Sequence, residues 1–310
     1  MALQIADRVA TKLRIALTGP TNAGKTYSGL RLAFGIAKFL NPDLPDEEIW
    51  KQRIAVGDTE RGRARMYVNR KDLPLPTGQF LYQQIRAPYD PEKAIAFLKE
   101  AEKAVGPNGV VFLDSTSHFW SYKGGVLDIK EQIAKQAGKN SYTAWNEAGA
   151  IQNEWLDVLL SLDCHVIVTI RSKMDYVLEQ DEKGRAVPVK KGLAPIQRDD
   201  MEYEFDITLM LDKDHIARVI KDTTFLNQIG FEGMLTEQLG SQLVEWMEQG
   251  TDPKEFQEEE RLALISQIKA LAKKHKPLAT FYRDMYPNTK SDELTLEQAE
   301  EVLEKFREVL

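Results

Sequence analysis

Gly19-Pro20-Thr21-Asn22-Ala23-Gly24-Lys25-Thr26 matches the phosphate-binding pattern G-x-x-x-x-G-K-[ST] at every fixed position. The flanking patterns predict a strand over residues 13–17 and a helix over residues 25–40. In such a loop, inward-facing backbone N–H groups and the helix N-terminus hold phosphates. We therefore expect all eight residues to bind a nucleotide, with the Lys25 ammonium at the β- and γ-phosphates and the Thr26 hydroxyl on Mg²⁺.

Two acidic residues after later apolar strands complete the expected site. Asp114 ends the run Val110-Val111-Phe112-Leu113, which is typical of a strand buried on both faces of a parallel sheet. Because α/β sheets bind ligands at the carboxyl ends of their strands, we expect Asp114 to be the second Mg²⁺ anchor. Glu60, in Asp58-Thr59-Glu60, also follows a strand and is expected to activate water for hydrolysis.

Strand and helix patterns alternate through about the first 220 residues. Further strands are expected over 79–85 and 166–170, helices from Asp90-Pro91 and near 148–162, and a hairpin within 205–220. This alternation predicts an α/β fold with a central, mostly parallel sheet and helices on both faces. The charged helical pattern of 251–310 predicts a small C-terminal helical domain after a core of residues 1–250.

Composition excludes several other classes of protein. The 310 residues include 41 Lys and Arg against 48 Asp and Glu, a net charge of −7, which excludes nucleic-acid binding by bulk positive charge. The single cysteine, Cys164, excludes an internal disulfide. No run of 18 apolar residues and no signal-peptide pattern is present, so we expect a cytoplasmic protein without membrane contact.

Two basic stretches stand out against this acidic background. The one over 183–198 has no acidic residue and contains glycine and proline, which predicts a loop that contacts the phosphate backbone of single-stranded DNA. The other follows Glu60 and is expected to be solvated surface, whereas Tyr142 and Trp145 are expected to pack rather than stack on bases. The predicted DNA-binding residues are Lys183, Arg185, Lys190, Lys191 and Arg198, and the second stretch comprises Arg61, Arg63, Arg65, Arg70 and Lys71.

The motifs, taken in order, resemble those of the phage-type RecA-like P-loop ATPases. This family occurs in phage recombination modules and includes single-strand-annealing proteins. The resemblance covers about residues 12–225. It rests on residues 19–26, 58–60, 113–120, 143–145, 164–169, 171–177 and 201–205.

The resemblance implies a RecA-like core that uses ATP and Mg²⁺. It implies that Glu60 is the water-activating acid, that Thr169 and Arg171 sense the γ-phosphate, and that the segments after Asp114 and Arg171 face DNA. Family members act as homo-oligomers with ATP at subunit interfaces, where a basic residue of the neighbour reaches the nucleotide. Lys221-Asp222-Thr223-Thr224 stands where the family has Lys-Asp-Arg-Thr. Lys221 is therefore left to act alone, and loss of such an arginine costs about a thousandfold in turnover.

These observations predict an ATP- and Mg²⁺-dependent ATPase that acts on single-stranded DNA in recombination or annealing. The alternative is a nucleotide-gated adaptor or loader for other replication or recombination proteins, with little intrinsic hydrolysis. In that alternative, residues 251–310 are the docking module. Salt-sensitive, ATP-dependent binding of an oligonucleotide distinguishes the two.

Overall fold

The computed structural model describes residues 8–136, 138–180, 186–250, 253–287 and 289–309. The chain divides into two compact units. The larger unit comprises residues 12–247, and the smaller one comprises residues 248–310 together with the residues that precede Lys12.

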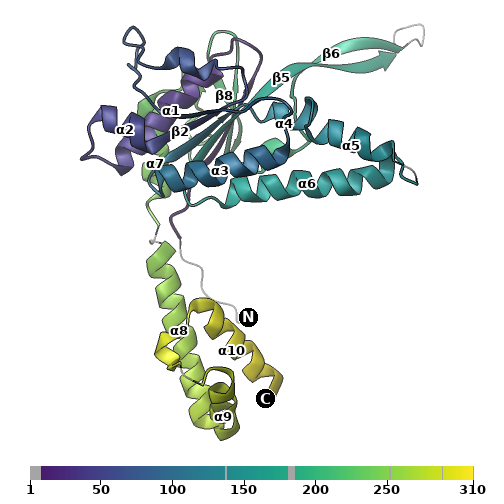
Figure 1. The fold of residues 1–310 in the computed structure, drawn as a ribbon. Helices are drawn as coiled ribbons and strands as arrows, with labels where there is room; N and C mark the ends of the chain where they lie inside the picture. The colour runs from purple at the N-terminus through teal and green to yellow at the C-terminus, as the bar shows by residue number, and fades with distance from the viewer. Residues whose placement is uncertain (1–7, 137, 181–185, 251–252, 288, 310) are drawn as a thin grey trace. The chain divides into compact units, whose positions relative to one another are not determined.

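A sheet of nine described strands forms the centre of the larger unit (Figure 1), in the order β3-β2-β4-β5-β1-β7-β8-β9, with β6 paired to β5 alone. The strands from β3 to β7 in this order are all parallel, and β8 and β9 add antiparallel pairs at one edge. This arrangement confirms the predicted α/β fold and the hairpin of residues 205–220. The strands are β1 (Arg14–Gly19), β2 (Ile54–Asp58), β3 (Leu81–Gln84), β4 (Val110–Asp114), β5 (His165–Gln180), β6 (Ala186–Pro195), β7 (Ile207–Leu211), β8 (Ala217–Asp222) and β9 (Glu232–Gly233).

Helices cover both faces of the sheet because its inner strands are apolar on both sides. Ile15 and Leu17 pack into the core beneath α1, α2 and α7, whereas Ala16 between them packs into the core beneath α3 and α6. Short helices follow the ends of β2 and β4 and precede β7. The helical elements of this unit are α1 (Lys25–Leu40), α2 (Asp46–Arg53), η1 (Ala64–Tyr67), α3 (Pro91–Val105), α4 (Ser117–Ser121), α5 (Val126–Ala134), α6 (Ser141–Ser161), η2 (Met201–Tyr203) and α7 (Glu237–Met247).

Beyond the sheet, β5 continues into a two-stranded ribbon with β6. Its residues up to Arg171 pair with β1, whereas the ribbon runs from the pair Ser172↔Pro195 to the pair Gln180↔Ala186. Figure 1 shows this ribbon projecting away from the core. The predicted loop is therefore wrong for residues 186–195. Two prolines in β6 obscured the strand pattern, and an isolated ribbon accepts them because each strand has one unpaired side.

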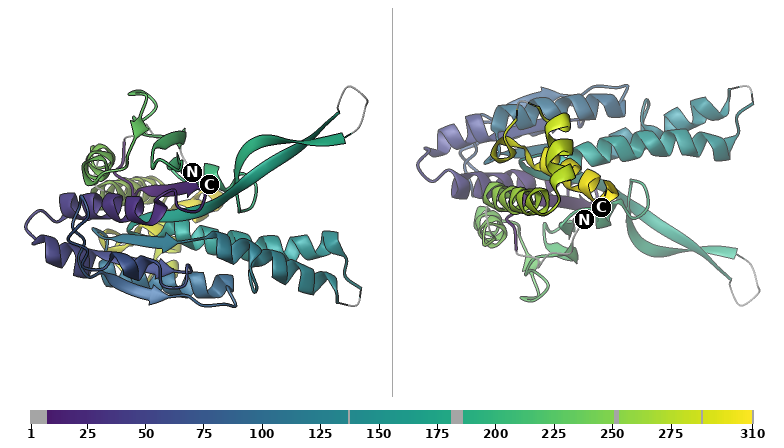
Figure 2. Two further views of the ribbon diagram at one scale, coloured as in Figure 1. Left: turned by 90° about the horizontal axis from the view of Figure 1, so that it is seen from above. Right: turned by 90° about the horizontal axis from the view of Figure 1, so that it is seen from below.

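The α5–α6 pair also differs from the sequence prediction. A capping box at Asn140 and Thr143 starts α6 at Ser141, well before the predicted 148. Tyr142 is 79% exposed, so the prediction that it packs is wrong, while Trp145 is 40% exposed and stacks on Trp120. Both views of Figure 2 show this helix pair and the ribbon projecting from the same side of the core.

The smaller unit is helical and has an apolar core of its own. Ile268, Leu278, Leu294 and Phe306 lie at its centre and are almost fully buried. Its elements are α8 (Pro253–Lys274), α9 (Lys276–Met285), η3 (Ser291–Glu293) and α10 (Leu296–Val309).

Within the described ranges, no helix is long and apolar enough to cross a membrane.

Candidate nucleotide site

The phosphate loop joins the buried strand β1 to the first turn of α1. Gly24 precedes the helix in the left-handed region, with φ of 80°, and Asn22 has φ of 66°. A Cβ atom at Gly24 would lie 2.7 Å from Nδ1 of His215 in the β7–β8 turn. Gly24 is therefore required both by its backbone conformation and by the close approach of that turn.

The Lys25 side chain folds back over the loop. Its Nζ donates hydrogen bonds to the carbonyl oxygens of Gly19 at 2.7 Å and Pro20 at 2.8 Å. Burial lowers the pKa of Lys25 to about 8, although the carboxylates of Asp114 and Glu60 oppose this shift. The ammonium group is thus held against the backbone of the phosphate loop and lines the cavity beside it.

Asp114 lies at the end of β4, and its side chain accepts hydrogen bonds from two hydroxyl groups. Thr26 Oγ1 donates to Asp114 Oδ2 at 2.6 Å, and Thr169 Oγ1 on β5 donates to Oδ1. Burial raises the pKa of Asp114. The paired Thr26 hydroxyl and Asp114 carboxylate are the hard oxygen donors that Mg²⁺ prefers, so these residues fit the expected ion. The Thr169 hydroxyl orients the carboxylate.

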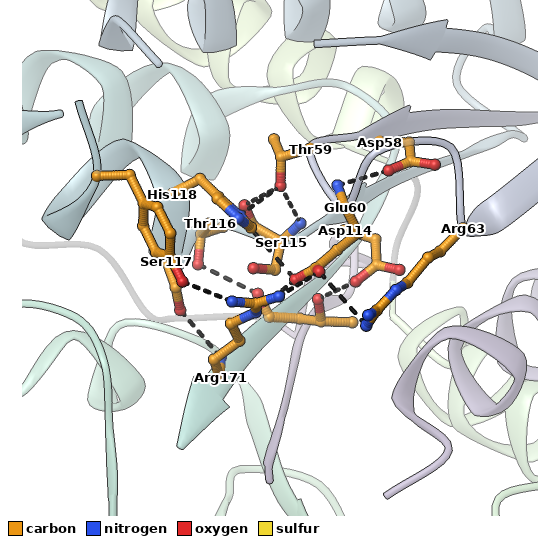
Figure 3. A network of polar contacts seen from close by, with 12 residues as sticks. Asp58, Thr59, Glu60, Arg63, Asp114, Ser115, Thr116, Ser117, His118 and Arg171 are labelled. Carbon is orange, nitrogen blue, oxygen red and sulfur yellow. Dashed lines mark hydrogen bonds and ion pairs between the residues drawn. The ribbon is translucent and has the colours of Figure 1, made fainter. Parts of the chain in front are cut away.

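Glu60 is ion-paired at the same edge of the sheet. Figure 3 shows the Arg171 guanidinium pointing at its carboxylate, with Nε 2.6 Å from Oε1 and Nη2 in contact with Oε2. Arg63 lies 3.8 Å from the same carboxylate. Burial favours a higher pKa for Glu60, but its hydrogen bonds and ion pair with Arg171 outweigh burial and hold the pKa below the usual value. Glu60 is therefore an ionised carboxylate near the phosphate loop.

Buried polar residues fix the backbone around Glu60 (Figure 3). Asp58 accepts hydrogen bonds from the backbone N–H groups of Glu60 at 2.6 Å and Ala64 at 3.0 Å. The Thr59 hydroxyl lies 2.8 Å from His118 Nδ1 and accepts from the Ser115 N–H at 2.7 Å. Burial lowers the pKa of His118 to about 4, so its imidazole is neutral at physiological pH. Asp58 and Thr59 therefore position Glu60 and the turn after Asp114.

The phosphate loop, Glu60, Asp114 and Arg171 line a cavity of about 390 Å³. Nine of the predicted site residues line it together, namely residues 21–26 of the loop with Glu60, Asp114 and Arg171. Thr169 does not line it but hydrogen-bonds to Asp114. The sequence analysis did not assign Arg63, Met66, Tyr67 and Arg70 to the site. Their position shortly after Glu60 and the end of β2 could have indicated that they lie near it. The lining comprises Thr21, Asn22, Ala23, Gly24, Lys25, Thr26, Glu60, Arg63, Met66, Tyr67, Arg70, Asp114 and Arg171.

A second cavity of about 390 Å³ adjoins the first at Gly24, Tyr67 and Arg70. The rings of Tyr27 and Tyr67 stack with centroids 5.8 Å apart. The remaining lining is more apolar than that of the first cavity and includes Leu73, Pro74, Met234 and Leu235. The two cavities together offer a polar compartment beside an aromatic one.

The other predicted residues lie away from this cavity. Lys221 pairs with Thr208 near the amino ends of the parallel strands, and its Nζ donates to the carbonyl oxygens of Tyr203 and Phe205. Arg198 hydrogen-bonds to Asn153 at 2.6 Å. In the ribbon, Lys190 stands opposite Tyr176 and Lys191 lies at a bulge. Lys183 and Arg185 fall outside the described residues.

A phosphate loop between a buried strand and a helix, with a carboxylate on the threonine after its lysine, defines a P-loop nucleoside triphosphatase. The sequence model of the AAA domain matches residues 11–230, which span β1 to β8 and the whole nucleotide site. The chain therefore belongs to the AAA domain family of P-loop ATPases. No curated protein matches it.

Proposed function

We propose that the protein is an ATP- and Mg²⁺-dependent ATPase that acts on single-stranded DNA as a homo-oligomer, in recombination or annealing of the phage type. The main support for ATP hydrolysis is that Lys25, Thr26, Asp114 and Glu60 all line one cavity. Lys25 and the loop N–H groups hold phosphates, and the Thr26–Asp114 pair holds Mg²⁺.

Arg171 links nucleotide binding to Glu60. Its guanidinium lines the cavity, so the γ-phosphate competes with Glu60 for the same donor groups. When Arg171 turns to the phosphate, the ionised Glu60 carboxylate is released and accepts the proton of the attacking water. The ion pair therefore restrains hydrolysis until a triphosphate is bound.

The adjoining aromatic cavity suits the nucleotide base. Tyr67 lines both cavities, and its ring lies on the path from the phosphate loop to the apolar lining. A purine placed there would pack against an aromatic face while its phosphates reach Lys25. This arrangement supports a nucleoside triphosphate, rather than free polyphosphate, as the ligand.

The ribbon supports the DNA-binding part of the proposal. It continues directly from β5, the strand that carries Thr169 and Arg171. Its described residues include three lysines, Lys173, Lys190 and Lys191, against two carboxylates, Asp175 and Glu179, in a protein whose net charge is −7. Such an element offers cations to a phosphate backbone and is joined covalently to the γ-phosphate sensor.

Hydrolysis is tested by ATP turnover and nucleotide affinity of Glu60→Gln, which keeps the shape of the side chain and removes its charge. We expect a nucleotide affinity no weaker than that of the wild type, because Arg171 is released from Glu60, and turnover slower by about 10²–10⁴-fold, the usual scale for loss of a general base. Glu47→Gln, an exposed glutamate of α2, is the matched control. Wild-type turnover in Glu60→Gln would remove Glu60 from the mechanism.

DNA binding is tested by a salt titration of oligonucleotide affinity with a non-hydrolysable ATP analogue. Each phosphate contact contributes about −0.7 to the slope of log affinity against log salt. Lys190→Ala with Lys191→Ala should therefore make the slope shallower by about 1.4, and Lys99→Ala with Lys103→Ala on α3 should leave it unchanged. An unchanged slope in the ribbon variant would remove the ribbon from the DNA site.

Two observations favour a second candidate function, a nucleotide-gated adaptor with little hydrolysis. Glu60 is held by Arg171, and the smaller unit has its own core, as a docking module requires. This candidate predicts ATP binding without oligonucleotide binding at low salt. The titration above therefore distinguishes the two functions.

A further inference from the structure

A third cavity, of about 480 Å³, is lined by Arg61, the residue that follows Glu60, and by residues that do not line the nucleotide cavity. Its volume falls in the range of ligand pockets, about 300–1,000 Å³. It is formed by the residue after Glu60, the end of β3 with the turn that follows, and the end of α4. Its lining comprises Arg61, Gln84, Ile85, Arg86, Ala87, Tyr89, His118, Tyr122 and Lys123.

The lining is cationic. Among the described residues it contains three cations, Arg61, Arg86 and Lys123, and no carboxylate. Lys93 adds a fourth positive charge beside the cavity, where its Nζ holds the carbonyl oxygens of Arg86 at 3.2 Å and Pro88 at 2.7 Å. A protein with a net charge of −7 thus concentrates positive charge around one concave site, which favours an anionic ligand.

Aromatic rings form one wall of the same cavity. Tyr122 is 36% exposed and packs against His118, with centroids 4.2 Å apart, and edge-on against Tyr89 at 6.2 Å. The Arg171 guanidinium lies 5.8 Å from the centre of the same ring, so His118, Tyr89 and Arg171 hold the partly exposed Tyr122 side chain in place. Cations beside a fixed aromatic face are the combination that binds a nucleotide unit of a single strand.

Tyr122 also connects this cavity to the nucleotide site. Its hydroxyl accepts a hydrogen bond from Arg171 Nη1 at 2.6 Å, and Arg171 binds Glu60 through its other nitrogens. One hydrogen bond therefore joins a residue that lines the third cavity to a residue that lines the nucleotide cavity. A ligand on Tyr122 acts on the residue that restrains Glu60.

We propose that this cavity is a second DNA site, which binds one phosphate and its base from a single strand. Arg61, Arg86 and Lys123 take the phosphate, and the base stacks on Tyr122. The inference rests on the proposed function and adds a site that is separate from the ribbon. The proposal gives a binding role to Arg61, which belongs to the basic stretch that the sequence analysis expects to be solvated surface.

The experiment compares two variants of the full chain with equal loss of charge. The test variant carries Arg61→Gln, Arg86→Gln and Lys123→Gln, and the control carries Lys99→Gln, Lys103→Gln and Lys213→Gln at exposed positions elsewhere. Affinity for an oligo-dT probe is titrated against salt with a non-hydrolysable ATP analogue. If two or three of the cations contact phosphate, the slope of the test variant becomes shallower by about 1.4–2.1, while the control matches wild type. Equal slopes in both variants would overturn the proposal.

Photocrosslinking locates the strand independently of affinity. An oligonucleotide with 5-iodouracil should crosslink to a peptide that contains Tyr122, and excess unlabelled oligo-dT, but not inorganic phosphate, should suppress the crosslink. Crosslinks confined to the ribbon would overturn the second site and leave the proposed function intact. Failure of wild-type protein to bind the probe at low salt, despite ATP turnover, would overturn both the site and DNA binding.

Discussion

At the residue scale, Arg171, Asp114 and Lys25 of the nucleotide site all have hydrogen-bond partners within the protein. Arg171 donates hydrogen bonds to Glu60. The hydroxyl groups of Thr26 and Thr169 donate to Asp114, and Lys25 donates to two carbonyl oxygens of its own loop. Binding of a magnesium nucleotide through Lys25, Thr26 and Arg171 would exchange their present contacts for contacts with the ligand, while Thr169 would go on orienting Asp114. The site therefore responds to ligand by rearranging contacts that already exist.

Nucleotide affinity should fall as pH rises through the lowered pKa of Lys25. The folded-state pKa is about 8, so the ammonium that attracts phosphate is lost above that pH. Between pH 7.5 and 9 the charge of the triphosphate is constant, and the dissociation constant should rise by about tenfold as Lys25 deprotonates. Isothermal titration calorimetry with a non-hydrolysable ATP analogue measures this dissociation constant at each pH. Lys25→Met should bind weakly with no such trend, and a flat wild-type profile would contradict the prediction.

At the element scale, helix packing determines how α1 presents the phosphate loop. A Cβ atom at Gly35 would lie 1.9 Å from the carbonyl oxygen of Glu237, so α1 and α7 approach backbone to backbone. The Arg31 side chain adds an ion pair to Glu237 at 2.8 Å. α7 therefore holds the helix whose first turn carries Lys25 and Thr26.

Gly35→Ala should destabilise the larger unit. The added methyl group forces α1 and α7 apart, and overpacking of this kind costs about 1–3 kcal/mol. Gly149→Ala in α6 is the matched control, since nothing lies within 4 Å of its Cβ position and a helical alanine gains about 0.5–1 kcal/mol. Urea unfolding measures both changes, and destabilisation of equal size in the two variants would argue against the packing explanation.

Much of the core was predictable from the sequence because local patterns determine it. The phosphate loop, the helix of residues 25–40 and the apolar run before Asp114 are each encoded by adjacent residues. The ribbon was missed because β6 is stabilised by pairing with β5, and no local pattern outweighs its prolines. The Glu60–Arg171 pair joins residues 111 positions apart, so only the sheet order brings them together.

At the scale of the whole molecule, the predicted catalytic residues lie at both ends of the sheet. The nucleotide cavity lies at the carboxyl ends of β1, β2 and β4, whereas Lys221 pairs near the amino ends of the parallel strands. One chain therefore cannot bring Lys221 to its own nucleotide. If Lys221 acts in hydrolysis, the subunits must associate head to tail, with the amino-end surface of one facing the carboxyl-end surface of the next.

Mixed subunits test this association. Lys221→Ala lacks the group given to the neighbour, and Glu60→Gln lacks the acid of its own site, so each alone should be nearly inactive. In a random 1:1 mixture, about a quarter of head-to-tail interfaces combine an intact Lys221 with an intact Glu60, and turnover should recover to about that fraction of wild type. Lys25→Ala mixed with Glu60→Gln is the matched control. Both of those groups belong to one subunit's site, so this mixture should show no recovery. Thermal unfolding of Lys221→Ala checks that loss of the hydrogen bonds to Tyr203 and Phe205 leaves the fold intact. No recovery in mixed oligomers of confirmed composition would show that Lys221 has only a structural role in its own subunit, through its hydrogen bonds to Tyr203 and Phe205.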